Sequence, residues 1–371
     1  MSGLRKAQVL PAPSGQSRVV VALSGGVDSA VAAALLVGQG HEVIGVMLRL
    51  WRERGPDGTD ARAGDLSAAV DRARRVANWL GIPFRLVDAA DAFKRQVVDY
   101  LVAEYTAGCT PNPCVRCNRT IRFGLLLDQS GALGAEFLAT GHYARVRHVA
   151  GRCQLLRGRD RHKDQSYFLH ALDQEQLARV RFPLGELAKE DVRAIARQAG
   201  LPVAEQPESQ DICFLGGGDY RRFLARRVSH LFRPGPIRDT SGRVLGQHQG
   251  LPAYTIGQRK GLGIAAAAPL YVLAIEPAEN ALIVGPAEDL GQDECLVEEM
   301  HYIDGETPTA AFRAAAQIRH RAVPALVTVT PLPSRRARVH FVTPQRDIAP
   351  GQFLVLYDGE VVLGGGAICK L

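Results

Sequence analysis

Short apolar runs alternate with longer helical stretches over the first part of the chain. The apolar run 18–24 (RVVVALS) precedes an alanine-rich helical stretch at 30–40, and a second apolar run follows at 41–48 (HEVIGVML). An amphipathic stretch at 68–81 and a third apolar run at 84–89 continue the pattern. Continuous apolar runs separated by helical segments are typical of parallel strands covered by helices. The pattern therefore predicts a β-α-β-α-β order and an α/β fold with a parallel sheet.

The character of the chain changes twice further on. From about residue 219, Gly and Pro interrupt short segments, and beyond about residue 288 apolar and polar residues alternate with period two. The runs 325–332, 336–342 and 353–368 show this alternation, which predicts a small β-barrel or sandwich. We therefore expect four parts: a flexible tail at 1–16, a parallel-sheet catalytic domain at 17–218, a central linker domain at 219–287 and a C-terminal β-barrel domain at 288–371.

Composition narrows the class of protein. With 46% apolar and 22% charged residues, the 371-residue chain has the composition of folded domains. A net charge of +7 favours a polyanionic partner such as nucleic acid, although a soluble enzyme that happens to be basic explains it equally well. No stretch resembles a membrane helix of roughly 20 apolar residues or a signal peptide, so we expect a cytoplasmic protein without membrane attachment.

The stretch SGGVDS at 24–29 lies where an apolar run gives way to a helical one. Adjacent glycines let the backbone curl closely around a ligand, and the exposed N–H groups of a helix N-terminus bind anions. The stretch is not a P-loop, because no lysine follows, and it is not the Rossmann GxGxxG fingerprint. A plain Gly-Gly turn with a helix cap explains the turn but not the full string. The stretch therefore predicts a phosphate cradle.

Two cysteine clusters point to sulfur chemistry. The segment 108–124 contains Cys114 and Cys117 as C-x-x-C, and without a second such pair a structural zinc site lacks its four ligands. Cys117 follows a Pro-rich turn, which we expect to hold it at the surface, and it precedes two arginines of the kind that lower a thiol pKa. Cys213 lies in ESQDICFLGGGDY, where a polar stretch turns apolar. Two such thiols near a nucleotide site suggest that one carries a persulfide and the other resolves it.

The total of seven cysteines is odd and low for this length, which argues against a secreted disulfide framework. For four of them we expect a buried, inert thiol: Cys109, Cys153, Cys295 and Cys369.

The SGGVDS stretch resembles the pyrophosphatase loop of the PP-loop ATP-pyrophosphatase family, whose members cleave ATP between the α and β phosphates and adenylate a carbonyl oxygen. The strings TPNPCVRCNRTIRF, ATGHYAR, HKDQSYFL, SQDICF, YTIGQRKGLGI and PGQFLVLYDGEVVLGGGAI follow in the order seen in the tRNA 2-thiouridylase family, over about residues 18–370. The resemblance implies a tRNA-uridine 2-sulfurtransferase that converts the wobble uridine of tRNAs for Lys, Glu and Gln to 2-thiouridine, using ATP and a persulfide sulfur.

The resemblance also gives individual residues a role. Uracil O2 would be adenylated with loss of pyrophosphate, sulfur would attack C2, and AMP would leave. Cys213 is similar to the cysteine that carries the persulfide, and Cys117 to the partner that assists sulfur release, which would leave the two in a disulfide bond. Asp28 would bind Mg²⁺, a hard cation that prefers carboxylate and phosphate oxygens. The implied ATP-binding residues are Ala22, Leu23, Ser24, Gly25, Gly26, Val27, Asp28, Ser29, Leu48 and Gly141.

A wobble base must leave the anticodon stack before a thiol can reach it, and unstacked bases are most accessible in single-stranded loops. The resemblance implies tRNA contacts at Asn112, Pro113, Cys114, His142, Lys163, Asp164, Gln165, Arg319, His320 and Gln352. For His142 a packed histidine after a strand is the alternative, and for the run at 319–321 a solvated basic face is the alternative. The barrel and the net positive charge together favour a phosphate-binding surface.

Several alternatives stay open at this point. Cys114, Cys117 and Cys213 could together hold a 4Fe-4S cluster that binds hydrosulfide in place of a protein persulfide. A PP-loop synthetase that uses ammonia or an amine would leave Cys117 and Cys213 without a role, and an RNA-binding module with a degenerate nucleotide loop would not release pyrophosphate. The resemblance implies a cysteine desulfurase or persulfide carrier as sulfur donor, and a monomer bound to one tRNA is the simplest expectation.

Overall fold

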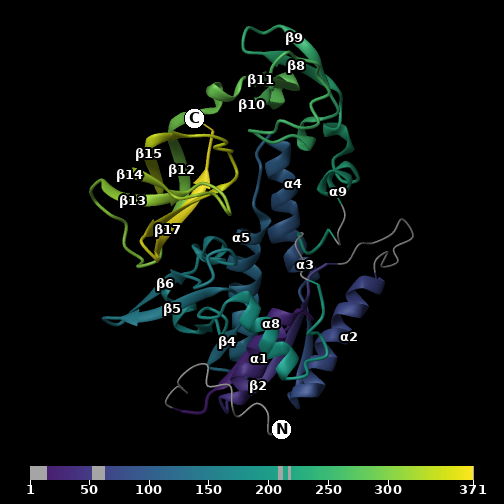
Figure 1. The fold of residues 1–371 in the computed structure, drawn as a ribbon, viewed down its shortest axis with the longest axis vertical. Helices are drawn as coiled ribbons and strands as arrows, with labels where there is room; N and C mark the ends of the chain where they lie inside the picture. Colours follow the sequence, from purple (N-terminus) through teal and green to yellow (C-terminus); the bar gives the residue numbers. More distant parts are fainter. Residues whose placement is uncertain (1–14, 52–62, 208–211, 216–218, 371) are drawn as a thin grey trace. The chain divides into compact units, whose positions relative to one another are not determined.

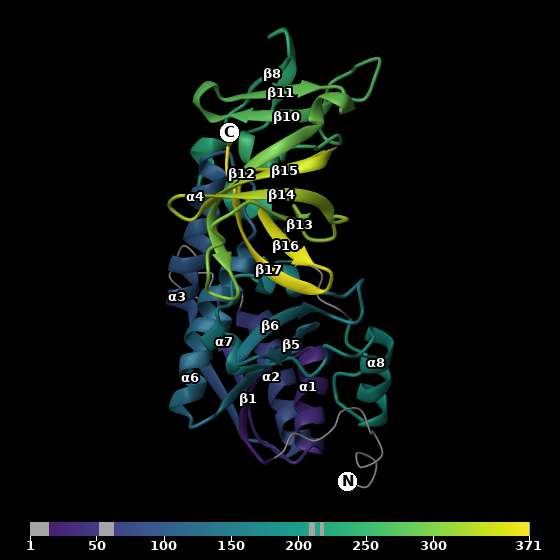
Figure 2. The same cartoon turned by 90° about the vertical axis from the view of Figure 1, so that its left-hand side faces the viewer.

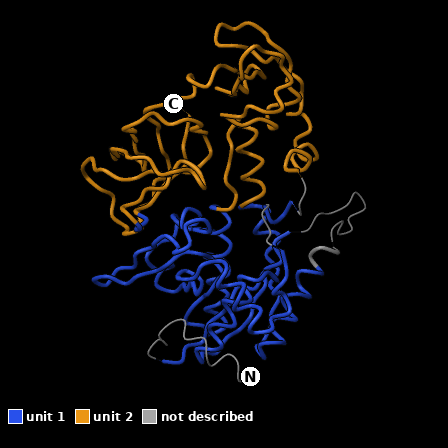
Figure 3. Tube along the Cα trace, in the orientation of Figure 1, with its two compact units in different colours: residues 1–96, 115–216, 360–362 blue, residues 97–114, 217–359, 363–371 orange. Residues whose placement is uncertain are grey.

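The computed structural model describes residues 15–51, 63–207, 212–215 and 219–370, so the predicted tail at 1–16 lies almost entirely outside the described residues. The chain divides into two compact units, each built from separate stretches of sequence. Unit 1 comprises 1–96, 115–216 and 360–362, and unit 2 comprises 97–114, 217–359 and 363–371 (Figure 3). Among the described residues, no helix combines the length and the apolar character that crossing a membrane requires.

Unit 1 is built on a five-stranded, all-parallel sheet in the order β3-β2-β1-β4-β7, and β1 pairs with β2 on one side and β4 on the other. Its elements are β1 (Arg18–Ala22), α1 (Val27–Gly38), β2 (Glu42–Arg49), α2 (Ala63–Leu80), β3 (Phe84–Asp88), α3 (Ala90–Phe93), η3 (Asn118–Leu125), α6 (Leu126–Ala132), β4 (Phe137–Ala139), β5 (Ala144–Val149), β6 (Arg152–Arg157), η4 (Ser166–Leu169), α7 (Gln174–Ala178), β7 (Val180–Arg181) and α8 (Lys189–Gln198). The η2 turn (Lys94–Val98) and α5 (Pro113–Cys117) run across the boundary between the units along the chain.

The predicted β-α-β-α-β order and parallel sheet are confirmed. Helix α1 begins at Val27, inside the SGGVDS stretch, with Gly26 as its N-cap residue, whereas the pattern predicts a start near Ser29, two residues later. Helix α1 is alanine-rich and most of it is buried, since α2 and α8 pack beside it and the sheet lies beneath it (Figure 1). This core fixes the edge of the sheet at which β1 ends and α1 begins.

Unit 2 contains a small sheet and a barrel. The small sheet has the order β10-β11-β8-β9 and packs a core around Ile237, Val272 and Leu282. The barrel runs β12-β15-β14-β13-β16-β17 and closes through pairing of β12 with β17 (Figure 2), which confirms the predicted C-terminal barrel. The elements are α4 (Asp99–Thr106), α9 (Tyr220–Ala225), η5 (Ser229–Leu231), β8 (Gly235–Asp239), β9 (Val244–His248), η6 (Leu251–Ala253), β10 (Tyr271–Glu276), η7 (Pro277–Glu279), β11 (Ala281–Gly285), η8 (Ala287–Leu290), β12 (Gln292–Tyr302), β13 (Phe312–Gln317), β14 (Ala325–Leu332), β15 (Arg336–Gln345), β16 (Phe353–Asp358) and β17 (Val361–Ile368).

Candidate nucleotide and thiol sites

The loop between β1 and α1 is braced by its own serines. The Ser24 N–H donates to Ser29 Oγ at 3.1 Å, and Ser29 Oγ donates to the Gly26 carbonyl at 3.1 Å. Gly25 has φ +78°, and a Cβ there would lie 2.7 Å from the Ala69 carbonyl oxygen, so only glycine fits. Gly26 precedes α1 without a side-chain cap, which leaves the first N–H groups of the helix to bind an anion.

The other predicted nucleotide residues lie at the same edge of the sheet. Leu48 is half-buried near the end of β2, and Gly141 follows β4 by two residues. Since β2 and β4 flank β1 in parallel, the carboxyl ends of all three strands meet there, and ligands of open α/β sheets bind at such an edge. A Cβ on Gly141 would lie 2.8 Å from both Asp28 C and Ser29 N. The structure therefore brings the ten predicted residues to one edge of the sheet, and their binding of ATP stays a prediction.

Two residues that the sequence analysis missed contact Asp28. Lys189, the first residue of α8, places its Nζ 2.6 Å from Asp28 Oδ1, and the Tyr143 hydroxyl donates to the same oxygen at 2.9 Å. The Lys189 side chain is only 11% exposed. No local pattern links these residues, which are 161 and 115 positions away from Asp28. A buried lysine is rare without a charged partner. The one sequence feature that could have indicated this contact is a lysine at the first position of an amphipathic helix.

Cys117 does not lie at the surface, so that expectation is wrong. The Pro-rich turn begins helix α5, with Pro113 at its start, where proline is well tolerated. The chain continues directly into η3, and Cys117 is buried at the junction of the two helices. Cys117 is 7% exposed.

Cys213 is held by its neighbour Phe214, which is buried and packs edge-on against Phe93 with ring centroids 5.4 Å apart. Although Cys213 itself is exposed, enough protein surrounds the thiol that desolvation raises its pKa above the ordinary value. The charge of Arg122 opposes this rise and lowers the pKa. Arg122 belongs to η3, the helix that follows Cys117, so both predicted catalytic thiols are associated with this helix.

Of the four thiols expected to be buried and inert, Cys153 and Cys295 are buried, whereas Cys109 and Cys369 are only half-buried. Burial raises the pKa of all four, and it raises that of Cys295 to about 12. Across the described ranges, all seven cysteines are free thiols, and no three His, Cys, Asp or Glu side chains come together as a group that could hold a metal ion.

The segment predicted to lie beside the target base is tied to the barrel within unit 2. Asn112 Oδ1 accepts the Cys114 N–H at 3.2 Å, as an N-terminal helix cap does, and Cys114 is exposed. The Gln352 side chain donates to the Thr110 carbonyl at 2.8 Å, and the Thr110 N–H donates to the Pro350 carbonyl at 2.7 Å. Gln352 thus supports the loop that carries Asn112, Pro113 and Cys114.

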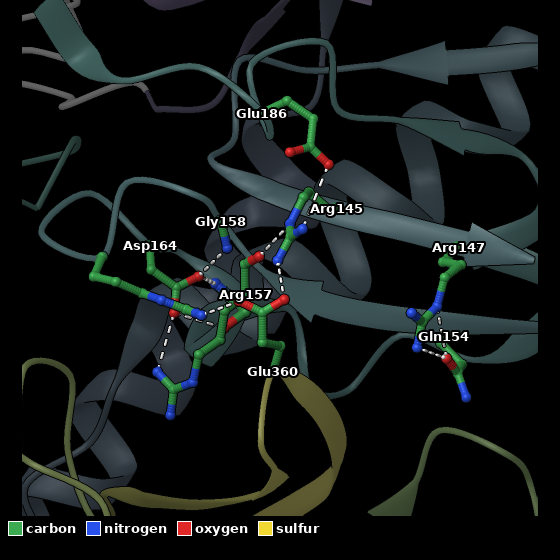
Figure 4. Close-up of polar contacts among 10 residues, drawn as sticks. Arg145, Arg147, Gln154, Arg157, Gly158, Asp164, Glu186 and Glu360 are labelled. Carbon is green, nitrogen blue, oxygen red and sulfur yellow. Dashed lines mark hydrogen bonds and ion pairs between the residues drawn. The ribbon is translucent and has the colours of Figure 1, made fainter.

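Asp164 was expected to contact RNA, but its side chain is buried within its own loop (Figure 4). Its carboxylate accepts the N–H groups of Gly158 and Ser166 at 2.9 and 3.0 Å, and the Arg157 guanidinium at 3.2 Å. The adjacent Gln165 accepts the Tyr143 N–H at 3.0 Å and donates its own N–H to the Tyr143 carbonyl at 2.9 Å. These contacts fix the backbone of the segment. The third predicted residue, Lys163, has a half-buried side chain.

His142 has the packed environment that was the alternative to an RNA contact. Its ring lies against Phe123 and Phe182, and its Nδ1 is 2.7 Å from Thr140 Oγ1. Burial, reinforced by the charge of Arg122, lowers the pKa of His142 to about 3, so the ring is neutral near pH 7. A tRNA contact by this side chain stays a prediction.

The depressed pKa of His142 predicts acid sensitivity. The unfolded chain binds a proton below about pH 6.5 that the folded chain excludes down to about pH 3, so stability is lost as the pH falls through this window. Wild type should therefore lose melting temperature between about pH 7 and pH 5 more steeply than His142→Phe, which cannot titrate. Thermal unfolding followed by circular dichroism measures both slopes, and parallel slopes would contradict the assignment.

In the barrel, the exposed Arg319 forms an ion pair with Asp347, with Nη1 and Oδ2 3.1 Å apart, and His320 is half-buried beside it. The two residues lie in the turn after β13, and their role toward tRNA stays a prediction.

Comparison with known proteins places the chain in a family. Residues 17–217 match the tRNA methyl transferase HUP domain, 221–286 the tRNA methyl transferase PRC-barrel domain, and 292–368 the aminomethyltransferase beta-barrel domain. The chain is 52% identical to the tRNA-specific 2-thiouridylase MnmA of Moorella thermoacetica over 352 residues, which cover 94% of this chain and 98% of that protein. It is 50% identical to the protein of the same name from Magnetococcus marinus, over 95% of this chain and 98% of that one.

Among solved structures, the U34-tRNA thiolase NcsA from Methanococcus maripaludis matches 62% of this chain and 71% of its own, with 20% identity and a TM-score of 0.37, a likeness too weak to bear on chemistry. The two curated relatives match nearly from end to end at about half of all positions. The chain therefore belongs to the tRNA-specific 2-thiouridylase family.

Proposed function

We propose that this protein thiolates C2 of the wobble uridine in tRNAs for Lys, Glu and Gln, using ATP and a persulfide on Cys213. The observation that carries the proposal is that one compact unit contains both a phosphate-binding loop, from Ser24 to Ser29, and the two thiols Cys117 and Cys213. Relatives over nearly the whole chain are tRNA-specific 2-thiouridylases, which supports a tRNA substrate.

The chemistry follows from the charges that develop. Uracil O2 attacks the α phosphate of ATP and pyrophosphate leaves, which turns O2 into a good leaving group. The N–H groups at the start of α1 offset the negative charge on the phosphates. ATP brings its own Mg²⁺, which Asp28 would bind, since carboxylate oxygens suit this cation.

Sulfur transfer then uses both cysteines. The terminal sulfur of the Cys213 persulfide attacks C2, and AMP leaves with the former O2. Cys117 attacks the Cys213 sulfur, which releases 2-thiouridine and leaves a Cys117–Cys213 disulfide that an external thiol reduces before the next round. A persulfide-carrying protein such as a cysteine desulfurase supplies the sulfur.

A basic stretch of unit 1 supports RNA binding. Between 145 and 163 the chain has seven Arg or Lys residues and a single acidic one. Arg145 and Arg157 are paired with carboxylates, whereas Arg147 donates from Nε and Nη2 to Gln154 Oε1 at 3.1 and 2.7 Å (Figure 4). Within the described ranges no carboxylate pairs with Arg147, so its exposed positive charge is available to bind the phosphates of RNA.

Thiolation of an unmodified tRNA-Lys transcript tests the function directly. With ATP, Mg²⁺ and a persulfide source, digestion and nucleoside mass spectrometry should detect 2-thiouridine, together with AMP and pyrophosphate. The same transcript with cytidine at the wobble position is the control and should stay unmodified. AMP formation that requires ammonia or an amine and yields no thiolated nucleoside would show a PP-loop synthetase instead.

A further inference from the structure

The predicted magnesium ligand is fixed through one of its two oxygens. Lys189 Nζ and the Tyr143 hydroxyl both reach Asp28 Oδ1, at 2.6 and 2.9 Å. Within the part of the chain that the structure describes, no side chain or N–H donates to Asp28 Oδ2. The Asp28 side chain is 35% exposed and that of Lys189 is 11% exposed, so the carboxylate is accessible while its cationic partner is not.

The two partners of Asp28 are themselves held in place. Lys189 begins α8, its backbone N–H donates to Asp160 Oδ2 at 3.1 Å, and its Nζ lies 5.6 Å from the centre of the Tyr143 ring. The backbone of Tyr143 makes two hydrogen bonds with Gln165: the Tyr143 N–H donates to Gln165 Oε1, and the Gln165 N–H donates to the Tyr143 carbonyl. Residues that orient a metal ligand through hydrogen bonds commonly matter almost as much as the ligand.

We propose that Lys189 and Tyr143 are positioning residues that hold Asp28 by Oδ1, so that Oδ2 binds the magnesium ion of ATP. The SGGVDS loop contains no lysine, and Lys189 supplies a buried cation to this loop from a distant helix. The donor set fits Mg²⁺, because a carboxylate oxygen beside a phosphate cradle is the kind of ligand that this cation takes. This inference rests on the proposed ATP site.

Nucleotide binding tests the inference apart from turnover. Calorimetry on the full-length protein gives the Kd of ATP with Mg²⁺ and with EDTA, for wild type, Lys189→Met and Tyr143→Phe. We expect Lys189→Met to weaken MgATP binding by about 10- to 100-fold, and Tyr143→Phe by about tenfold, the effect of one hydrogen bond to a charged group. Metal-free ATP should bind all three proteins within about twofold, since positioning of Asp28 acts only through the metal.

The matched control is Glu190→Gln, which removes a charge from the next, exposed residue of α8 and should leave both Kd values unchanged. A double variant combines Lys189→Met with Asp28→Asn. Because the introduced asparagine is uncharged, the loss of Lys189 then leaves no unpaired carboxylate that could impair folding. In the Asp28→Asn background, Lys189→Met should have no further effect on the Kd.

Three results would overturn the inference. Equal weakening of metal-free ATP, or a further loss in the Asp28→Asn background, would mean that Lys189 contacts the nucleotide directly. Unchanged MgATP binding in both single variants would mean that neither residue positions Asp28. By contrast, a wild-type protein that binds no MgATP would contradict the proposed function itself.

Discussion

Cys213→Ala is expected to reduce 2-thiouridine formation by on the order of 10³-fold or more, because the variant has no sulfur with which to carry the persulfide. Pyrophosphate release in the presence of tRNA should survive, since adenylation of uracil O2 precedes sulfur transfer and uses the loop from Ser24 to Ser29. The measurements are nucleoside mass spectrometry for 2-thiouridine and a coupled assay for pyrophosphate. Cys117→Ala should also stop release of 2-thiouridine, but it should accumulate tRNA joined to Cys213 through a disulfide, which a non-reducing gel detects as a protein–RNA adduct.

Two control variants separate the persulfide scheme from its alternatives. Cys153→Ala removes a buried thiol of the same unit whose pKa burial raises, and this variant should keep full activity. Cys114→Ala should also retain thiolation in the persulfide scheme. If Cys114→Ala is as inactive as Cys213→Ala, and only anaerobic, iron-containing protein is active, the iron–sulfur scheme is correct. If thiolation persists in Cys213→Ala itself, Cys213 carries no sulfur.

The sequence predicts those parts of the fold that depend on neighbouring residues. Apolar runs of four to eight residues around an alanine-rich stretch indicate strand, helix and parallel sheet, because each signal is local. The position of SGGVDS at the β1–α1 junction could also be predicted, because it depends only on the residues just before and after the string. Alternation after residue 288 left a barrel or a sandwich open, since closure depends on pairing between β12 and β17, which are distant in the sequence.

Contacts between distant segments lie beyond such patterns. Lys189 reaches Asp28 across 161 positions, and nothing near either residue announces the pair. Cys117 was expected at the surface because Pro residues precede it, but Pro113 begins a helix whose inner face carries the thiol. Asp164 was assigned to RNA by resemblance, yet its carboxylate accepts hydrogen bonds inside its own loop. For Cys117 and Asp164 a local motif or a resemblance identifies the segment, while packing decides where the side chain points.

Gly141→Ala is expected to lower kcat/KM for ATP by about 100-fold, through sterics alone, because a displacement of about 1 Å in a reacting group costs that much. The added Cβ would meet Asp28 C and Ser29 N at 2.8 Å, and both are backbone atoms that cannot rotate away. The β1–α1 loop would therefore shift, and with it the N–H groups that we expect to bind the phosphates. Overpacking should also lower the stability of the protein by about 1–3 kcal/mol.

Gly38→Ala is the matched control, since it adds the same methyl group to α1 where nothing lies within 4 Å. Because glycine is a poor helix former, this variant should gain about 0.5–1 kcal/mol of stability and keep its kinetics. The rate of pyrophosphate release at several ATP concentrations gives kcat/KM, and urea unfolding gives the free energy of unfolding for both variants. Equal kcat/KM values in the two variants would mean that the approach of Gly141 to Asp28 has no part in nucleotide binding, and that the phosphates bind elsewhere.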